Sequence, residues 1–121
     1  MRTGKITIQE KEYILCFSTR VLMRLEERGG NADAELKRIM EGGKISDLFW
    51  LLAQMVDAGD RYARLEGLDN PGTLSLDDMA DLIGVDDYPK MLGALTDTIQ
   101  KGNTPTIQTK AEKNAKTTQE E

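Results

Sequence analysis

Paired carboxylates and a single thiol are the side chains in this sequence whose types and spacing could do chemistry. The acidic pairs are Asp77-Asp78 and Asp86-Asp87, and Cys16 is the only cysteine among 121 residues. Paired carboxylates could bind a hard cation, and a thiolate could act as a nucleophile. Both acidic pairs stand where a helix is expected to begin, and there a carboxylate stabilises the positive end of the helix dipole. We therefore expect them to support helix starts and predict no metal site.

The sequence contains no histidine. This removes the commonest general base and the usual zinc ligand. Cys16 lies between Leu15 and Phe17 in a run that resembles a strand, so we interpret it as a small buried hydrophobe. A lone cysteine also excludes an intramolecular disulfide and is typical of a reducing compartment. We expect no catalytic residue and no cofactor, and hence a binding protein instead of an enzyme.

The overall charge of the chain is negative. Lys and Arg number 16 against 21 Asp and Glu, which gives a net charge of −5. Nucleic acid and anionic membranes would be repelled on average, so we expect neither as a partner. The N-terminal residues form neither the apolar run of a signal peptide nor a stretch long enough to span a membrane. A protein partner in the cytoplasm is the expectation.

The elements that must position these residues are a short β-hairpin and about five helices. Two β-prone runs surround the charged link Gln9–Glu12 and predict a hairpin within 5–17. Apolar spacing, glycine pairs and turn residues predict five helices. These helices are expected at 19–28, 32–41, 47–66, 76–83 and from about 86 to 101. The fold class is therefore mainly α, with one compact domain over 1–101 and a flexible, disordered polar tail over 102–121.

Three serines are expected to cap helices, since each follows an apolar residue that can pack against another in the first turn. They are Ser18, Ser46 and Ser75.

A candidate partner-binding surface is formed by four apolar residues: Phe49, Trp50, Met91 and Leu95. The first two fall beside the inward stripe of the helix at 47–66, and the other two lie on the apolar stripe of the last helix. The alternative for both pairs is burial in the core, which is the usual place for such side chains.

Residues 75–92 also resemble a helix-turn-helix, with Ala80 in the first helix, Gly84 in the turn and Val85 after it. A small DNA-binding regulator using 75–100 is therefore an alternative function. The second helix is poorly suited to reading bases, because it would offer only Lys90 to base edges that arginine, glutamine or asparagine usually contact.

The order of several segments resembles the tail assembly chaperones of siphophages and Gram-positive prophages. The segments are Lys5-Ile-Thr-Ile with Lys11-Glu-Tyr-Ile-Leu, then Phe17-Ser-Thr-Arg-Val-Leu-Met-Arg-Leu-Glu-Glu-Arg-Gly-Gly, then Asp47-Leu-Phe-Trp-Leu-Leu-Ala-Gln-Met with Ala58-Gly, and finally Leu74-Ser-Leu-Asp-Asp-Met-Ala-Asp-Leu-Ile. Together they cover about residues 5–100.

This resemblance implies a non-enzymatic factor that binds the phage tape measure protein in the host bacterial cytoplasm. It would keep that protein soluble until the tail tube assembles around it. The tail tube protein is a further expected partner, and self-association would suit the coating of a long rod. The resemblance assigns no binding residue, so the four-residue surface is a hypothesis drawn from the pattern alone.

Overall fold

The computed structural model describes residues 2–103 of the chain. The predicted polar tail lies outside the described residues from position 104 onward, so the domain boundary after residue 101 stays a prediction.

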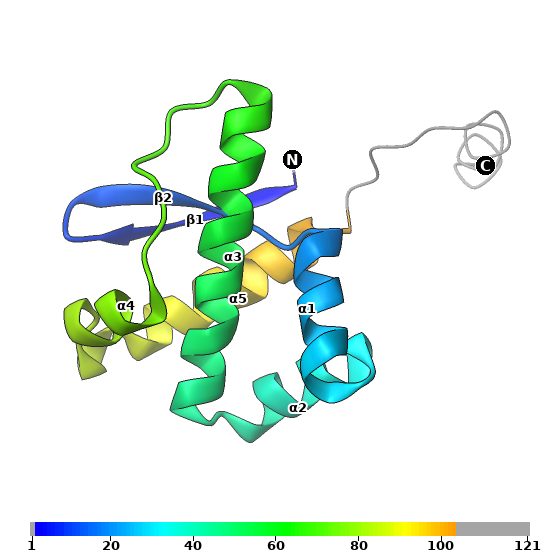
Figure 1. Cartoon of the computed structure of the whole chain (residues 1–121). Coiled ribbons are helices and arrows are strands. Elements are labelled where there is room, and N and C mark those ends of the chain that lie inside the picture. The colour runs from blue at the N-terminus through cyan, green and yellow to red at the C-terminus, as the bar shows by residue number, and fades with distance from the viewer. Residues whose placement is uncertain (1, 104–121) are drawn as a thin grey trace, which may run out of the picture.

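An antiparallel hairpin forms the N-terminal part of the structure (Figure 1). Strands β1 (Thr3–Ile8) and β2 (Lys11–Cys16) pair in a continuous register that ends with Ile8 opposite Lys11. Gln9 and Glu10 alone form the turn, with positive φ angles of 50° and 66°. Two such residues are typical of the type I′ turn, whose twist matches that of the strands. The hairpin prediction is confirmed, with a shorter link than the predicted Gln9–Glu12.

Helices make up most of the rest, which confirms the mainly α fold class. They are α1 (Thr19–Gly29), α2 (Ala32–Gly42), α3 (Ile45–Glu66), α4 (Leu76–Leu82) and α5 (Tyr88–Lys101), with a 3₁₀ turn η1 (Val85–Asp87) before α5. Gly30, Gly43 and Gly67 follow α1, α2 and α3 in the left-handed conformation, as expected for glycine at a helix end.

The predicted caps are confirmed in part. The hydroxyl of Ser75 accepts a hydrogen bond from the Asp78 N–H at 3.0 Å. Ser18 occupies the cap position of α1, but its side chain makes no cap hydrogen bond. The Ser46 prediction is wrong, because α3 already begins at Ile45 and Ser46 lies inside its first turn. Asn31, which sequence reasoning missed, caps α2 by accepting the Ala34 N–H at 2.9 Å.

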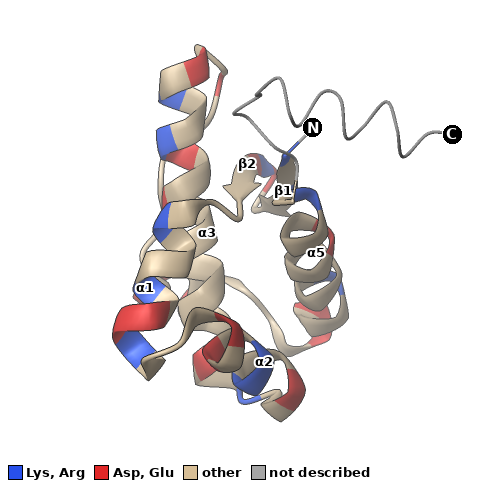
Figure 2. Ribbon diagram, turned by 90° about the vertical axis from the view of Figure 1, so that its right-hand side faces the viewer, with Lys and Arg blue, Asp and Glu red and all other residues tan. Residues whose placement is uncertain are grey.

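The long helix α3 forms the centre of the core. Its largest fully buried side chains are Leu51, Leu52, Met55 and Val56. It packs on β2, while α5 packs on β1, so helices cover both strands (Figures 1 and 2). Cys16 is buried, as predicted. Within residues 2–103, no helix is long and apolar enough to cross a membrane.

Two glycines allow helices to approach the hairpin closely. Gly59 of α3 lies against the backbone carbonyl of Ile14, and Gly4 of β1 lies against the side chain of Thr98 in α5. At both positions a Cβ atom would overlap with its neighbour. The missing side chain therefore sets the distance between helix and sheet.

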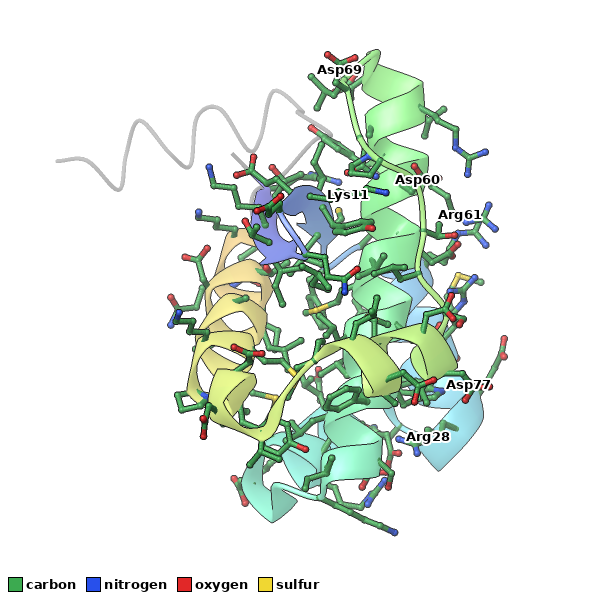
Figure 3. The ribbon with its side chains drawn as sticks, turned by 90° about the vertical axis from the view of Figure 1, so that its left-hand side faces the viewer. Lys11, Arg28, Asp60, Arg61, Asp69 and Asp77 are labelled. Carbon is green, nitrogen blue, oxygen red and sulfur yellow. The ribbon has the colours of Figure 1, made fainter. Side chains whose placement is uncertain are left out.

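The loop between α3 and α4 is attached to the hairpin by Asn70. Its Oδ1 accepts the Ile14 N–H at 2.8 Å, and its Nδ2 donates to the Asp60 carboxylate and the Gly72 carbonyl, both at 3.1 Å. Figure 3 shows the loop after Asp69 running beside α3 near Asp60. Because Ile14 belongs to β2, this side chain satisfies a backbone donor at the open edge of the hairpin.

We expect Asn70→Ala to lower the free energy of unfolding by about 1–3 kcal/mol, since it leaves the partly buried Ile14 N–H without an acceptor. Urea unfolding measures this change. Asn103→Ala, at an exposed position, is the matched control and should stay within about 0.5 kcal/mol of the wild type. Equal losses in the two variants would contradict the role given to Asn70.

Candidate functional site

The predicted partner-binding surface requires correction. Phe49, Met91 and Leu95 are 4%, 1% and 0% exposed, and only Trp50 is half-buried. Phe49 packs edge-to-face against Tyr88, with ring centres 6.1 Å apart. Three of the four residues therefore form core between α3, α5 and the hairpin, so the four do not make an exposed surface. Burial in the core, the alternative interpretation, is therefore correct for Phe49, Met91 and Leu95.

Trp50 lies over the junction of α1 and α3. The guanidinium carbon of Arg28 lies 4.4 Å from the centre of the indole ring, a cation–π contact between the two helices. This contact occupies one face of the ring, so Trp50 holds the two helices together.

A cluster of four charged residues joins α1, α2 and α3. Asp47, nearly buried, accepts hydrogen bonds from Arg28 at 2.8 Å and from Arg38 at 3.1 Å. Glu35, also nearly buried, binds Arg38 at 2.7 and 2.8 Å and lies 3.6 Å from Arg28. Every charge in the cluster meets an opposite one. We define these residues as the charge cluster and assign it a structural role.

Hydrogen bonding perturbs the carboxyl groups of the charge cluster. The hydrogen bond from Arg38 is the main cause that lowers the pKa of Glu35. Burial works against the charge of Asp47, but the hydrogen bonds from Arg28 and Arg38 outweigh it and lower the pKa of Asp47 as well. Both groups are therefore held in the charged form.

The acidic pairs lie at helix starts, as predicted. Asp77 and Asp78 occupy the first turn of α4, and the Asp87 carboxylate accepts the Gly84 N–H at 3.0 Å at the start of η1. In residues 2–103, no three His, Cys, Asp or Glu side chains gather as a metal site.

Helices α4 and α5 are joined by η1, the arrangement that the helix-turn-helix alternative requires. The inward side of α5 packs on β1, and the exposed residues around the turn include Asp81, Asp86 and Asp87. Figure 3 shows Asp77 on α4, which adds another carboxylate to this end of the molecule. Because these charges would repel a phosphate backbone, the geometry gives the DNA-binding alternative no support.

A hollow of about 580 Å³ lies between the start of α1, the second half of α3 and the N-terminus. Four arginines surround it, and we call it the arginine pocket. Its lining residues are Arg2, Cys16, Ser18, Thr19, Arg20, Ala58, Arg61, Tyr62, Arg64 and Leu65.

The floor of the arginine pocket is apolar. Burial raises the pKa of the Cys16 thiol, and the nearby Arg2 guanidinium partly offsets this. Burial also raises the pKa of Tyr62, and the neighbouring Glu66 adds to the rise. Both groups are therefore neutral at pH 7, and neither is activated as a nucleophile or base.

A second hollow of about 370 Å³ runs between α2 and α5, and we call it the α2–α5 groove. Its apolar side chains are Leu36, Met40 and Ile99, all partly exposed. The remaining lining residues are Asp33, Lys37, Glu41, Thr96 and Gln100. Apolar groups thus lie at the bottom and charged groups at the rim, the usual arrangement of a groove that receives an amphipathic helix.

No family model, curated protein or solved structure matches this chain. The two hollows are therefore the features from which a function can be argued.

Sequence reasoning missed both hollows. The spacing of Arg61 and Arg64 places them on neighbouring positions of one helix, which is a local signal. Arg2 and Arg20 come from other elements, and only the fold brings them to the same pocket. Leu36, Met40 and Ile99 were recognisable as members of apolar helical stripes, but a stripe does not show which of its members stay exposed.

Proposed function

We propose that this chain is a phage tail assembly chaperone, a non-enzymatic protein that binds the tape measure protein in the host cytoplasm and keeps it soluble until the tail tube assembles around it. The order of sequence segments that resembles this family supports the proposal. The observation that carries it in the structure is the α2–α5 groove, an apolar channel between two helices.

The groove fits what a long helical partner would expose. A tape measure protein that is not yet enclosed by its tube presents apolar residues at helical spacing, and these need a temporary cover. Leu36 and Met40 stand one turn apart on α2 and face Ile99 of α5 across the groove. Such a pair of ridges can hold side chains of a third helix at positions i, i+3 or i+4, and i+7.

The rim would fix the orientation of the bound helix. Asp33, Lys37 and Glu41 follow one another at single-turn intervals along α2, with alternating charge. Lys37 and Glu41 form only a loose, exposed ion pair of 4.0 Å, so both can exchange it for charges on a partner. Because rim charges act mainly on orientation and encounter rate, the apolar floor would supply most of the affinity. The tail tube protein is the second partner in this proposal.

The test is co-expression of a tagged copy with the tape measure protein of its own gene cluster, with the soluble, co-purified tape measure protein as the measured quantity. We expect the wild type to retain a soluble complex. The double variant Met40→Ser and Ile99→Ser should reduce co-purification about tenfold or more, since each loses apolar contact in the groove.

Met23→Ser is the matched control, because Met23 is 58% exposed on α1 and lines neither the arginine pocket nor the α2–α5 groove. It should bind as well as the wild type, and the thermal midpoint of each variant verifies folding. If the wild type forms no soluble complex, the chaperone proposal fails. If the wild type and the groove variant bind equally, the groove is not the binding surface.

A further inference from the structure

The arginine pocket concentrates positive charge on an acidic protein. The net charge of the chain is −5, yet four arginines line this pocket and none of its lining residues is acidic. Figure 2 shows blue segments on α1 and, between red ones, along the part of α3 above it. A positive hollow on a negative protein selects an anionic group locally while the remaining surface repels polyanions.

Three of the guanidinium groups, those of Arg20, Arg61 and Arg64, retain donors for a ligand. Arg61 and Arg64 use their Nε atoms to reach Asp57 at 3.0 Å and Asp60 at 3.3 Å, one turn earlier on α3. Their terminal Nη groups have no hydrogen bond within the part of the chain that the structure describes. Over the same residues, Arg20 makes no ion pair. These donors can bind a carboxylate through two parallel hydrogen bonds.

The start of α1 adds to the positive potential. No acidic residue lies in its first turn, and the Ser18 side chain makes no cap hydrogen bond. The positive end of the helix dipole is therefore not neutralised locally, at the point where Ser18, Thr19 and Arg20 line the pocket.

The arginine pocket also has an apolar part, so its ligand should carry an apolar group as well as a negative charge. Cys16 and Ala58 form the floor with the ring of Tyr62, and Leu65 at the rim is 85% exposed. An exposed leucine beside a hollow extends the apolar surface beyond the hollow itself. A peptide segment can cover both parts together, whereas a small anion would leave Leu65 in water.

We propose that the arginine pocket binds an acidic peptide segment of a partner protein, with carboxylates on the arginines and a large apolar side chain on the floor beside Tyr62. The site lies on different elements from the α2–α5 groove and does not depend on the proposed chaperone function.

The test uses the full chain and a fluorescein-labelled peptide in which Glu and Leu alternate in blocks, with binding followed by fluorescence anisotropy. We expect saturable binding that is weakened about tenfold or more by the double variant Arg20→Ala and Arg64→Ala, since charge-assisted hydrogen bonds are lost. The matched control is Lys44→Ala with Lys90→Ala, which removes the same charge at exposed positions that do not line this pocket. It should bind within about twofold of the wild type, because exposed charges elsewhere contribute little.

The proposal is overturned if the Glu-Leu peptide does not bind, or if the arginine variant binds it as well as the wild type. Equal binding of a Lys-Leu peptide, of a Glu-Ser peptide, or of single-stranded DNA of the same charge would also overturn it.

Discussion

Gly59→Ala should destabilise the protein by about 3 kcal/mol, because overpacking forces the surrounding structure to shift. The added methyl group would overlap with the carbonyl oxygen of Ile14 and lie 3.0 Å from the Leu15 Cα. Both neighbours are backbone atoms of β2, so neither can rotate away. Helix α3 would have to move off the hairpin, and the core residues between them would lose contact. Urea unfolding measures the change in free energy.

Gly93→Ala is the matched control for this substitution. Gly93 also lies inside a helix, α5, but a Cβ atom there would meet nothing within 4 Å. Since alanine favours the helix over glycine, Gly93→Ala should stabilise the protein by about 0.5–1 kcal/mol. The opposite signs expected for the same chemical change isolate the effect of the close approach. A Gly59→Ala protein as stable as the wild type would show that α3 and β2 are not held this closely.

Asp47→Asn should cause the largest loss of stability among single carboxylate substitutions, since it weakens two of the ion pairs that join α1, α2 and α3. Arg28 and Arg38 both bind the Asp47 carboxylate, and the Asp47 side chain is 7% exposed. The thermal midpoint at pH 7 should therefore fall. Asp97→Asn is the matched control, because Asp97 pairs with Lys101 in an exposed position and its loss should leave the midpoint nearly unchanged.

The two carboxylates of the charge cluster, together with Asp57, predict a dependence of stability on pH. The pKa values of Glu35, Asp47 and Asp57 are all lowered in the folded protein. A lowered folded pKa means that the unfolded chain binds protons more readily, so this stabilisation is present above the ordinary carboxyl pKa of about 4 and is lost as the pH falls below it. Between about pH 5 and pH 2, the wild-type midpoint should fall more steeply than that of Asp47→Asn. Parallel curves would contradict the role assigned to Asp47.

Local patterns were sufficient to predict the elements of this fold. Glycine at 30, 43 and 67 ends three helices where the apolar spacing breaks off, and each adopts the left-handed conformation that favours glycine. The hairpin was recognisable from two β-prone runs, although the two-residue turn at Gln9 and Glu10 was not, because neither residue is a usual type I′ turn former.

The faces of the helices were harder to predict than the helices themselves. Phe49 stands beside the main apolar stripe of α3, and it is buried because α3 packs on β2, α1, α2 and α4, so more than one of its faces lies inside. A periodic pattern shows which residues are apolar but not how many neighbours surround a helix. Met91 and Leu95 are buried because the last helix returns to the first strand, a contact between the two ends of the described chain.

The candidate sites depend on contacts that no local pattern encodes. Arg2, Arg20 and Arg61 are far apart in the sequence and line one pocket. Asn70 appeared to be an ordinary turn residue before Pro71, and its bond to Ile14 joins positions separated by 56 residues. Such contacts follow from tertiary packing, which determines the partner that a polar side chain binds once its element has formed.

The contact between β1 and α5 imposes an order on folding during synthesis. The hairpin leaves the ribosome before the helices that cover it, and α3 can cover β2 while synthesis continues. Strand β1 is covered by α5, so Ile8 and its neighbours stay uncovered until residues 88–101 have emerged from the ribosome. Contacts between distant segments close slowly, and an uncovered strand is prone to pair with other chains in the interval. A ribosome that stalls just before α5 would therefore release an aggregation-prone nascent chain, even though every other helix is complete.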